Sequence, residues 1–302
     1  MEIIKIENYI ENRFMTSVAL GNFDGIHLGH RKLILSMIKD SKELNIIPSV
    51  LLFNKHPKEV LFGKSPDFIT STEDKHEILE QMMVKIIYET EFNEEFRKLS
   101  PECFVKKILI DKLNVKSVFV GFDYRFGYKA SGDINTLKEL GDKYKFKVTI
   151  IDPVYDEKRV LSSTEIRMHI KEGNIRLANE MLGRNYKIKG QVVHGNKIGR
   201  TLGFPTANLE LSSNYQIPKI GVYETKTIID GKSYVSLTSI GTNPTVGGNS
   251  MKIETYILDF SSDIYNKKIQ IEFIKYIRKE MMFCNLEELK IQMQKDVETI
   301  KY

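Results

Sequence analysis

The stretch that decides the fold of the first half of the chain reads Ala19-Leu20-Gly21-Asn22-Phe23-Asp24-Gly25-Ile26-His27-Leu28-Gly29-His30. An apolar segment ends at Leu20, and the glycines at 21 and 25 permit a tight turn because glycine has no Cβ. A helical pattern of apolar residues follows directly. We therefore expect a strand, a glycine turn and the start of a helix.

The alternation of strand and helix patterns continues to about residue 184. Apolar segments typical of buried strands are Ser17–Leu20, Ser49–Phe53, Ser117–Val120 and Val148–Ile151, and helical patterns cover His30–Leu44, Thr72–Lys85, Pro101–Lys112 and about Ser163–Leu182. This order predicts an N-terminal α/β domain, residues 1–184, of the Rossmann-like kind, with a mostly parallel sheet covered on both faces. Such sheets bind ligands at the carboxyl ends of their strands.

The pattern changes after Tyr186, where short strand candidates follow one another without helices. These candidates are Ile188–Val193, Gly221–Ile229, Ser233–Ile240, Ile253–Leu258 and Lys268–Phe273, with turn signals at Asp230-Gly231 and Gly247-Gly248. We expect residues 185–302 to form a small antiparallel β-barrel of the Greek-key type. A C-terminal helix should close the chain, since Asn285 and Glu288 resemble a capping pair ahead of helically spaced apolar residues.

The composition limits the classes of protein to be considered. The 302 residues include 41% hydrophobic and 28% charged residues, and Lys+Arg 45 against Asp+Glu 40 leaves a net charge of only +5. This charge does not indicate nucleic acid binding but suits anionic small substrates. Cys103 and Cys284 form no Cys-x-x-Cys motif, so we expect a reducing cytoplasm. No signal peptide or membrane span is recognised, and we expect a monomer or weak homo-oligomer without a membrane partner.

His27 and His30 are the first candidate functional residues. They are three residues apart and therefore share one face of the expected helix, while Gly29 lets a base or ribose approach the backbone. The helix N-terminus adds N–H groups and a positive dipole end, which favour phosphate. The pattern indicates nucleotidyl transfer, in which two imidazoles donate hydrogen bonds to a triphosphate. A His-x-x-His motif on its own would equally fit two structural histidines or two metal ligands.

Two further segments are candidates for the same site. In Leu161–Arg167, the residue Ser163 can cap a helix and Arg167 lies one turn further on, which suits phosphate but is also common at ordinary helix starts. The segment Gly121–Gly127 directly follows an expected strand, so it is a candidate ligand loop, although its aromatic residues would also suit a core.

The segment Gly190–Asn208 supplies a second set of candidates. Its glycines can wrap a phosphate, although it lacks the Gly-Lys-Ser/Thr end of a Walker loop. Thr206 and Asn208 point the same way in an extended chain, so both oxygens can reach one Mg²⁺. Glu254 lies in an apolar strand candidate, where a carboxylate is costly unless it is used or paired. The spacing leaves open whether Glu254 is a functional base or lies on an exposed strand face.

The combined motifs resemble the bacterial bifunctional riboflavin kinase/FMN adenylyltransferase family over essentially the whole chain. The resemblance implies that an N-terminal nucleotidyltransferase domain binds ATP through Gly21, Asn22, Phe23, Asp24, His27, Gly29, His30, Ser163, Thr164 and Arg167. His27 and His30 would contact the ATP phosphates, and Asp123 and Phe126 would lie on the flavin side. The family segment matched by Phe53–Pro57 usually has a proline where Lys55 stands.

The second half of the chain resembles the kinase part of the same family, most clearly in Gly203-Phe204-Pro205-Thr206-Ala207-Asn208. The resemblance implies that Thr206 and Asn208 bind Mg²⁺ and ATP phosphate and that Glu254 is the base for the ribityl 5′-hydroxyl. It also implies a phosphate-covering loop with Gly195, Lys197, Gly199 and Arg200, and a flavin contact by Phe204. Arg278 would either contact flavin or anchor the final helix.

The resemblance therefore implies that the chain converts riboflavin to FMN and FMN to FAD, with ATP, riboflavin and FMN as substrates and Mg²⁺ as the cofactor. Three alternatives remain open from the sequence. The first is a chain with one active domain and the other retained as a scaffold, the second is a flavin-binding regulator that acts on nucleic acid, and the third is an N-terminal half that serves another nucleotidyl acceptor.

Overall fold

The computed structural model describes residues 1–8, 14–54, 60, 63, 66–156, 159–195, 199, 202–245 and 248–300, with backbone alone at 156, 159, 243–245 and 248–250. The chain forms two compact units, of which the first contains Met1–Pro66 and Thr72–Ser162 and the second contains Asp67–Ser71 and Ser163–Tyr302. The chain therefore passes from one unit to the other after residues 66, 71 and 162. The sequence predicts a domain boundary after residue 184. The last of the three crossings between the two units falls earlier, after residue 162.

The first unit contains a six-stranded sheet in the order β1-β4-β3-β2-β5-β6. All neighbouring strands are parallel, which confirms the expected α/β sheet. The strands are β1 (Glu2–Lys5), β2 (Thr16–Leu20), β3 (Ile47–Phe53), β4 (Ile86–Thr90), β5 (Val115–Gly121) and β6 (Lys147–Ile151). Sequence patterns missed β1 and β4. β1 is an edge strand with mostly exposed side chains, so it carries no buried apolar segment.

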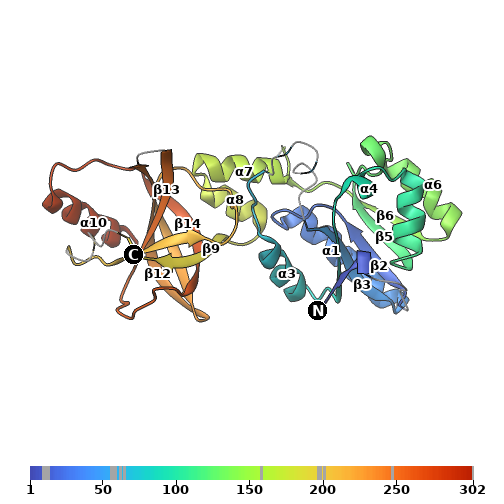
Figure 1. Ribbon diagram of the computed structural model, residues 1–302, viewed down its shortest axis with the longest axis horizontal. Coiled ribbons are helices and arrows are strands. Elements are labelled where there is room, and N and C mark those ends of the chain that lie inside the picture. Colours follow the sequence, from blue (N-terminus) through green and yellow to red (C-terminus); the bar gives the residue numbers. More distant parts are fainter. Residues whose placement is uncertain are drawn as a thin grey trace. The chain divides into compact units, whose positions relative to one another are not determined.

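Helices cover both faces of this sheet, as expected and as Figure 1 shows. They are α1 (Leu28–Leu44), α3 (Thr72–Gln81), α4 (Glu94–Arg97), α5 (Pro101–Phe104), the π-helical η2 (Val105–Ile110) and α6 (Ile134–Tyr144), with the short 3-10 turns η1 (Ile6–Asn8) and η3 (Tyr128–Ala130). Alternate β2 residues face opposite cores. Ala19 packs with residues of α1 and α3, whereas Val18 and Leu20 pack with residues of α5, η2 and α6.

The second unit begins with two helices, α7 (Ser163–Glu172) and α8 (Ile175–Leu182). The single helix expected over this range is therefore wrong. Gly173 adopts φ +83°, a left-handed conformation that ends a helix and that glycine adopts without a steric penalty. The side chain of Asn179 then joins α8 to the barrel, because its Nδ2 donates to the Phe273 oxygen at 2.9 Å.

A closed barrel of six antiparallel strands follows, in the order β10-β13-β12-β11-β14-β9. The strands are β9 (Tyr186–Val193), β10 (Thr206–Leu211), β11 (Gly221–Ile229), β12 (Lys232–Thr245), β13 (Gly248–Ile257) and β14 (Lys268–Arg278). β14 returns to pair with β11 after the β11-β12-β13 meander, which confirms the Greek-key type. Asp230 and Gly231 have positive φ values and form the expected two-residue hairpin turn, whereas the turn expected at residues 247 and 248 lies partly outside the described residues.

A ring of hydroxyl groups occupies the interior of the barrel. Five hydrogen bonds join the hydroxyl groups into a closed ring, with oxygen–oxygen distances of 2.8–3.4 Å. The order around the ring is Thr225, Ser236, Thr227, Thr255, Thr238 and back to Thr225. All five residues are fully buried. Each hydroxyl can donate one bond and accept one around the ring, so burial leaves none unsatisfied. The ring links β11, β12 and β13 and favours their observed register.

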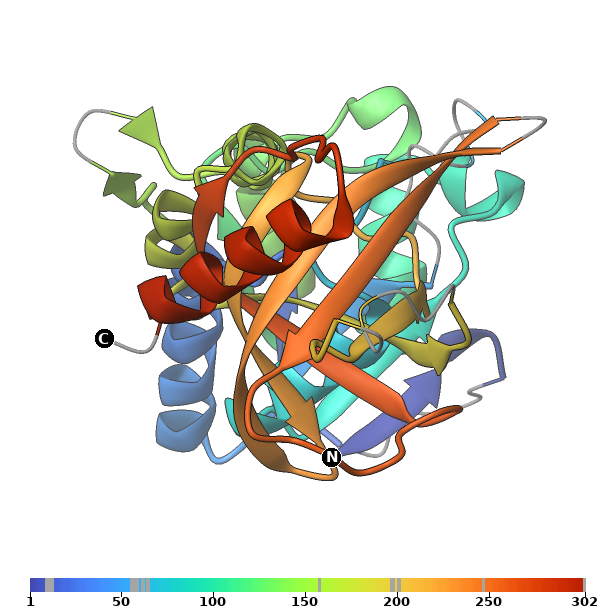
Figure 2. The same cartoon turned by 90° about the vertical axis from the view of Figure 1, so that its left-hand side faces the viewer.

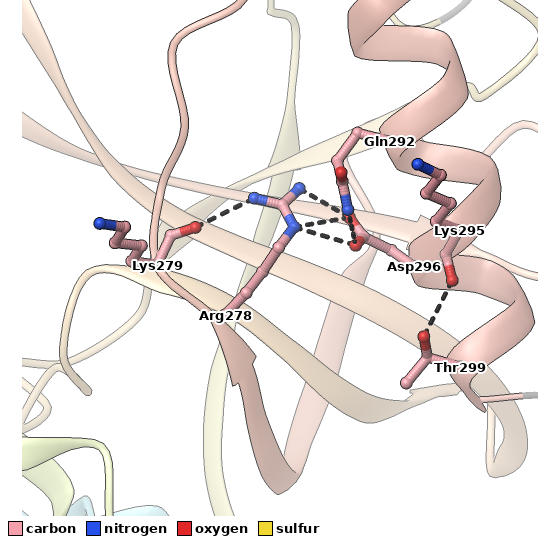
Figure 3. A network of polar contacts seen from close by, with 6 residues as sticks. All are labelled: Arg278, Lys279, Gln292, Lys295, Asp296 and Thr299. Carbon is pink, nitrogen blue, oxygen red and sulfur yellow. Dashed lines mark hydrogen bonds and ion pairs between the residues drawn. The ribbon is translucent and has the colours of Figure 1, made fainter.

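The C-terminal helix α10 (Leu286–Ile300) lies across the outside of the barrel (Figure 2). The expected capping pair is confirmed, because the Glu288 N–H donates to Asn285 Oδ1 at 2.9 Å. Arg278 at the end of β14 forms a bidentate ion pair with Asp296 of α10, with Nη2–Oδ2 at 2.6 Å (Figure 3). Asp296 is only 4% exposed and also accepts from Gln292. Of the two roles considered for Arg278, the structure shows the anchoring of the final helix.

Candidate functional sites

The first candidate site lies where β2 and β5 end side by side. β2 pairs with β5 in register Ala19–Phe119, and the chain order of the strands reverses at this pair. Gly21 follows β2 and Gly121 is the last residue of β5, so two loops begin at the same carboxyl edge. Ligands of open parallel sheets bind at such a reversal point, because the loops on either side diverge and leave a crevice.

The loop that follows β2 is strained and buried. Phe23 has φ +47° and Ile26 has φ +37°, which are unusual values for residues that carry a Cβ and most of all for a β-branched one. Each costs about 1–3 kcal/mol and persists only when the surroundings enforce it. Both side chains are fully buried, and the Phe23 ring contacts the His30 ring edge-on at 5.2 Å. The core thus holds a turn that the backbone alone disfavours.

The turn delivers His27 and His30 to the start of α1. His27 is the residue before the helix, and its Nδ1 accepts a 3.4 Å hydrogen bond from the His30 N–H. The two rings stack with centroids 3.7 Å apart, which confirms the shared face. Because Nδ1 accepts a bond, Nε2 is the ring nitrogen that carries the proton of a neutral His27. Gly29 lies beside this ring, and a Cβ there would approach His27 Nδ1 to 3.2 Å.

The loop after β5 separates its two candidate flavin residues. Asp123 is exposed, close to Gly121, where an added Cβ would lie 3.3 Å from Asp123 Oδ1. Phe126 is 7% exposed and packs against Phe104 and Tyr124 in the core, which is the alternative considered for the aromatic residues of this segment. A flavin contact by either residue stays a prediction.

The late phosphate motif begins α7 in the second unit. Ser163 and Arg167 are half-buried and Thr164 is exposed. The Arg167 Nε donates to the main-chain oxygen of Asp67 at 3.0 Å, and Asp67 in turn accepts from Asn214 at 2.9 Å. The guanidinium is therefore oriented by the Asp67–Ser71 segment. The binding of ATP by these three residues stays a prediction.

The second candidate site lies on the barrel where β10 pairs with β13. Asn208 lies directly opposite Glu254, and Thr206 lies opposite Tyr256. Thr206, Asn208 and Glu254 are all half-buried on the outward face, whereas Ala207 and Thr255 face the interior. The expected common direction of Thr206 and Asn208 is confirmed, and the pairing adds a carboxylate beside them.

Two glycines pack closely against this pair of strands. A Cβ on Gly195 would lie 2.2 Å from Nδ2 of Asn208, and a Cβ on Gly199 would lie 2.4 Å from the Phe204 oxygen. The Phe204 ring contacts Tyr256 edge-on at 5.2 Å. Burial, and after it the charge of Asp259, raise the pKa of Tyr256, so its phenol stays neutral. Two expected phosphate contacts, Lys197 and Arg200, lie outside the described residues.

Two lysines beside these sites were missed by sequence reasoning. Lys252 Nζ lies 2.9 Å from Glu254 Oε2, and their spacing of two in an expected strand is a signal that could have revealed the pair. Lys75 donates to the main-chain oxygen of Asn22 at 3.4 Å. These residues are 53 positions apart in the chain, and no local pattern connects them.

Metal ligands are sparse in the part of the chain that the structure describes. No group of three or more His, Cys, Asp or Glu side chains is placed to hold a metal among those residues. No helix among them is long and apolar enough to cross a bilayer. Cys103 and Cys284 are both free thiols.

Two family models match the chain, that of FAD synthetase over residues 10–165 and that of riboflavin kinase over residues 182–302. A bifunctional riboflavin kinase/FMN adenylyltransferase from Buchnera aphidicola subsp. Schizaphis graminum is 40% identical, over 100% of this chain and 98% of that protein. A protein of the same description from Bacillus subtilis is 38% identical, over 97% and 94%. A solved structure described as a macrolide-efflux protein from Streptococcus pneumoniae is 32% identical with a TM-score of 0.93, over 100% and 99% of the two chains.

Proposed function

The chain belongs to the bifunctional riboflavin kinase/FMN adenylyltransferase family, and from this premise we propose which of its residues serve each reaction. The protein phosphorylates riboflavin with ATP to give FMN and ADP, and it adenylates FMN with a second ATP to give FAD and pyrophosphate. The first reaction belongs to the part of the chain matched by the riboflavin kinase model and the second to the part matched by the FAD synthetase model.

His27 and His30 serve adenylyl transfer. In this step an FMN phosphate oxygen attacks the α-phosphorus of ATP, and the bond to the pyrophosphate oxygen breaks. Negative charge shifts toward the leaving pyrophosphate, and fixed donors lower the energy of that charge. The observation that supports this role is the ordered pair at the start of α1, in which His27 Nδ1 is occupied by the His30 N–H so that Nε2–H donates.

Glu254 serves phosphoryl transfer in the barrel. The ribityl 5′-hydroxyl must lose a proton as it attacks the γ-phosphorus, and Glu254 is the carboxylate on the face shared with Thr206 and Asn208. Lys252 Nζ lies 2.9 Å from its Oε2, and this ion pair orients the carboxylate. The register pair Asn208–Glu254 supports this role, because the Glu254 carboxylate lies on the same face as Asn208 and directly opposite it.

Mg²⁺ is proposed as the metal of the kinase reaction. Thr206 and Asn208 present a hydroxyl and an amide oxygen on one face of β10, and such oxygen donors suit Mg²⁺. Mg²⁺ is usually held by one or two protein oxygens together with substrate phosphates, and Thr206 and Asn208 offer two such oxygens. When bound, it would neutralise charge on the transferred phosphate.

Three properties of the whole protein remain proposals from its sequence. They are a cytoplasmic location, which the two free cysteines support, a monomer or weak homo-oligomer, and the absence of a nucleic acid partner. Size measurement in solution and a salt-dependent nucleic acid binding assay test the last two.

Product analysis tests the assignment. Riboflavin and MgATP should yield FMN and then FAD by chromatography. His30→Ala should abolish FAD formation and leave FMN formation intact, whereas Glu254→Ala should abolish FMN formation and leave the adenylation of supplied FMN intact. If each substitution removed both activities from folded protein, the assignment of independent sites would be refuted.

A further inference from the structure

Lys75 is a buried lysine in the first turn of α3. It is only 9% exposed, and its neighbour Asp74 is fully buried. Two effects destabilise a cation at this position. Burial removes its hydration, and the positive end of the helix dipole repels it. Helix α3 shares a hydrophobic core with α1 on one face of the sheet (Figure 1). A lysine retained there must have its ammonium held by acceptors.

One acceptor of this ammonium is the main-chain oxygen of Asn22, at 3.4 Å. Asn22 opens the strained turn in which Phe23 and Ile26 have positive φ values, and His27 directly follows that turn. In a trans peptide the C=O and the next N–H point in opposite directions. Fixing the Asn22 oxygen toward α3 therefore also fixes the direction of the Phe23 N–H and the path of the turn.

We propose that Lys75 is a positioning residue for adenylyl transfer, which holds the turn at Asn22 and thereby sets the place of His27 and His30. The proposal rests on the assignment of these histidines to the FMN adenylation site. Lys75 acts through the backbone, so the step itself is unchanged. The core buries Phe23 and Ile26, whereas Asn22 at the start of the turn is exposed, and the lysine contacts its main-chain oxygen.

Lys75→Met is the decisive variant, because methionine keeps the length of the side chain and removes the charge and the donors. We expect kcat for FAD formation from FMN to fall at least about tenfold, with KM for FMN within about twofold, since the FMN-side loop is untouched. Thermal unfolding of the same samples should separate a loss of rate from a loss of folded protein. Riboflavin kinase activity of the same sample should be unchanged, which controls for the amount of folded second unit, and the unfolding transition reports on the first. Lys75→Arg keeps the donors and should recover part of the rate.

Lys112→Met is the matched control. Lys112 also donates from its Nζ to a main-chain oxygen, that of Ile6, which follows the edge strand β1. This substitution should leave both activities as in the wild type. The role of Lys75 is overturned if Lys75→Met forms FAD at the wild-type rate, if it loses stability and both activities together, or if Lys112→Met reduces FAD formation equally. Absence of FAD formation by the wild-type protein would instead refute the proposed function and the Lys75 role with it.

Discussion

Gly195 offers the sharpest test of the kinase site, because its Cα lies against the side chain of Asn208. A Cβ added there would lie 2.2 Å from Nδ2, 2.5 Å from Cγ and 2.7 Å from Oδ1 of Asn208. Ordinary contacts between such atoms begin near 3.4 Å, so in Gly195→Ala the Asn208 amide must move by about 1 Å. The φ of Gly195 is not positive, so alanine brings no backbone strain.

The cost of this movement should fall on the reaction rather than on folding. Asn208 is half-buried on the outward face of β10, and a forced side-chain rotation costs about 0.5–1.5 kcal/mol. A displacement of about 1 Å in a group that positions reactants can cost about 10²-fold in rate, which corresponds to about 2.7 kcal/mol of activation free energy. We therefore expect FMN formation to fall about a hundredfold with a much smaller change in thermal stability.

The assay follows FMN formation from riboflavin and FAD formation from supplied FMN in the same sample. Gly29→Ala is the matched control, because its Cβ would approach the His27 ring to only 3.2 Å, and His27 can yield by a few tenths of an ångström. It should reduce FAD formation mildly and leave FMN formation intact. A Gly195→Ala protein that forms FMN within about threefold of the wild-type rate would refute the placement of Asn208 in the kinase site.

Three further predictions concern single side chains. Glu254→Gln keeps the shape of the side chain and removes the base, so kcat for FMN formation should fall by about 10²–10⁴-fold with FAD formation from FMN unchanged; an unchanged kcat would exclude Glu254 as the base. Asp296→Ala leaves the mostly buried Arg278 guanidinium without its carboxylate and should destabilise the protein by about 3–5 kcal/mol in thermal or urea unfolding, and a neutral result would show that α10 is held by its apolar contacts alone. Hydrogen bonds to the Asp133 carboxylate, first of all from the Thr136 N–H, lower the pKa of Asp133 in the folded protein. Asp133 therefore stabilises α6 at pH values above the pKa that it has in the unfolded chain. This stabilisation is lost as the pH falls through the lower pKa of the folded protein. Asp133→Ala should therefore lower the unfolding temperature at pH 7, and the difference from wild type should vanish in acid; a difference that persisted there would contradict this origin.

Local patterns predicted those parts of the fold whose causes lie within a few residues. The Asp230-Gly231 turn follows from two positive φ values that these residue types tolerate. The Asn285–Glu288 cap and the stacked His27–His30 pair follow from helical spacing of three. The break at Gly173 was missed, because a single glycine inside a helical pattern is compatible with either a continuous helix or its end.

Contacts between distant segments required the tertiary structure. A shift of β10 against β13 by one residue would turn Asn208 and Glu254 to opposite faces, and no local pattern sets that register. Phe126 shows the same limit, since the sequence allowed both a ligand loop and a core position and only packing against Phe104 placed its ring in the core.

The sequence by itself determined the two activities, because the residues proposed to bind phosphate lie in short motifs, Gly21–His30 and Gly203–Asn208, whose geometry is set by turns, strand alternation and helical spacing. The tertiary structure decided what supports those motifs. Lys75 reaches Asn22, and Arg278 reaches Asp296, only after strands and helices have packed. A buried charge is satisfied by whichever partner the fold brings to it, and that partner leaves no periodic signal in the chain.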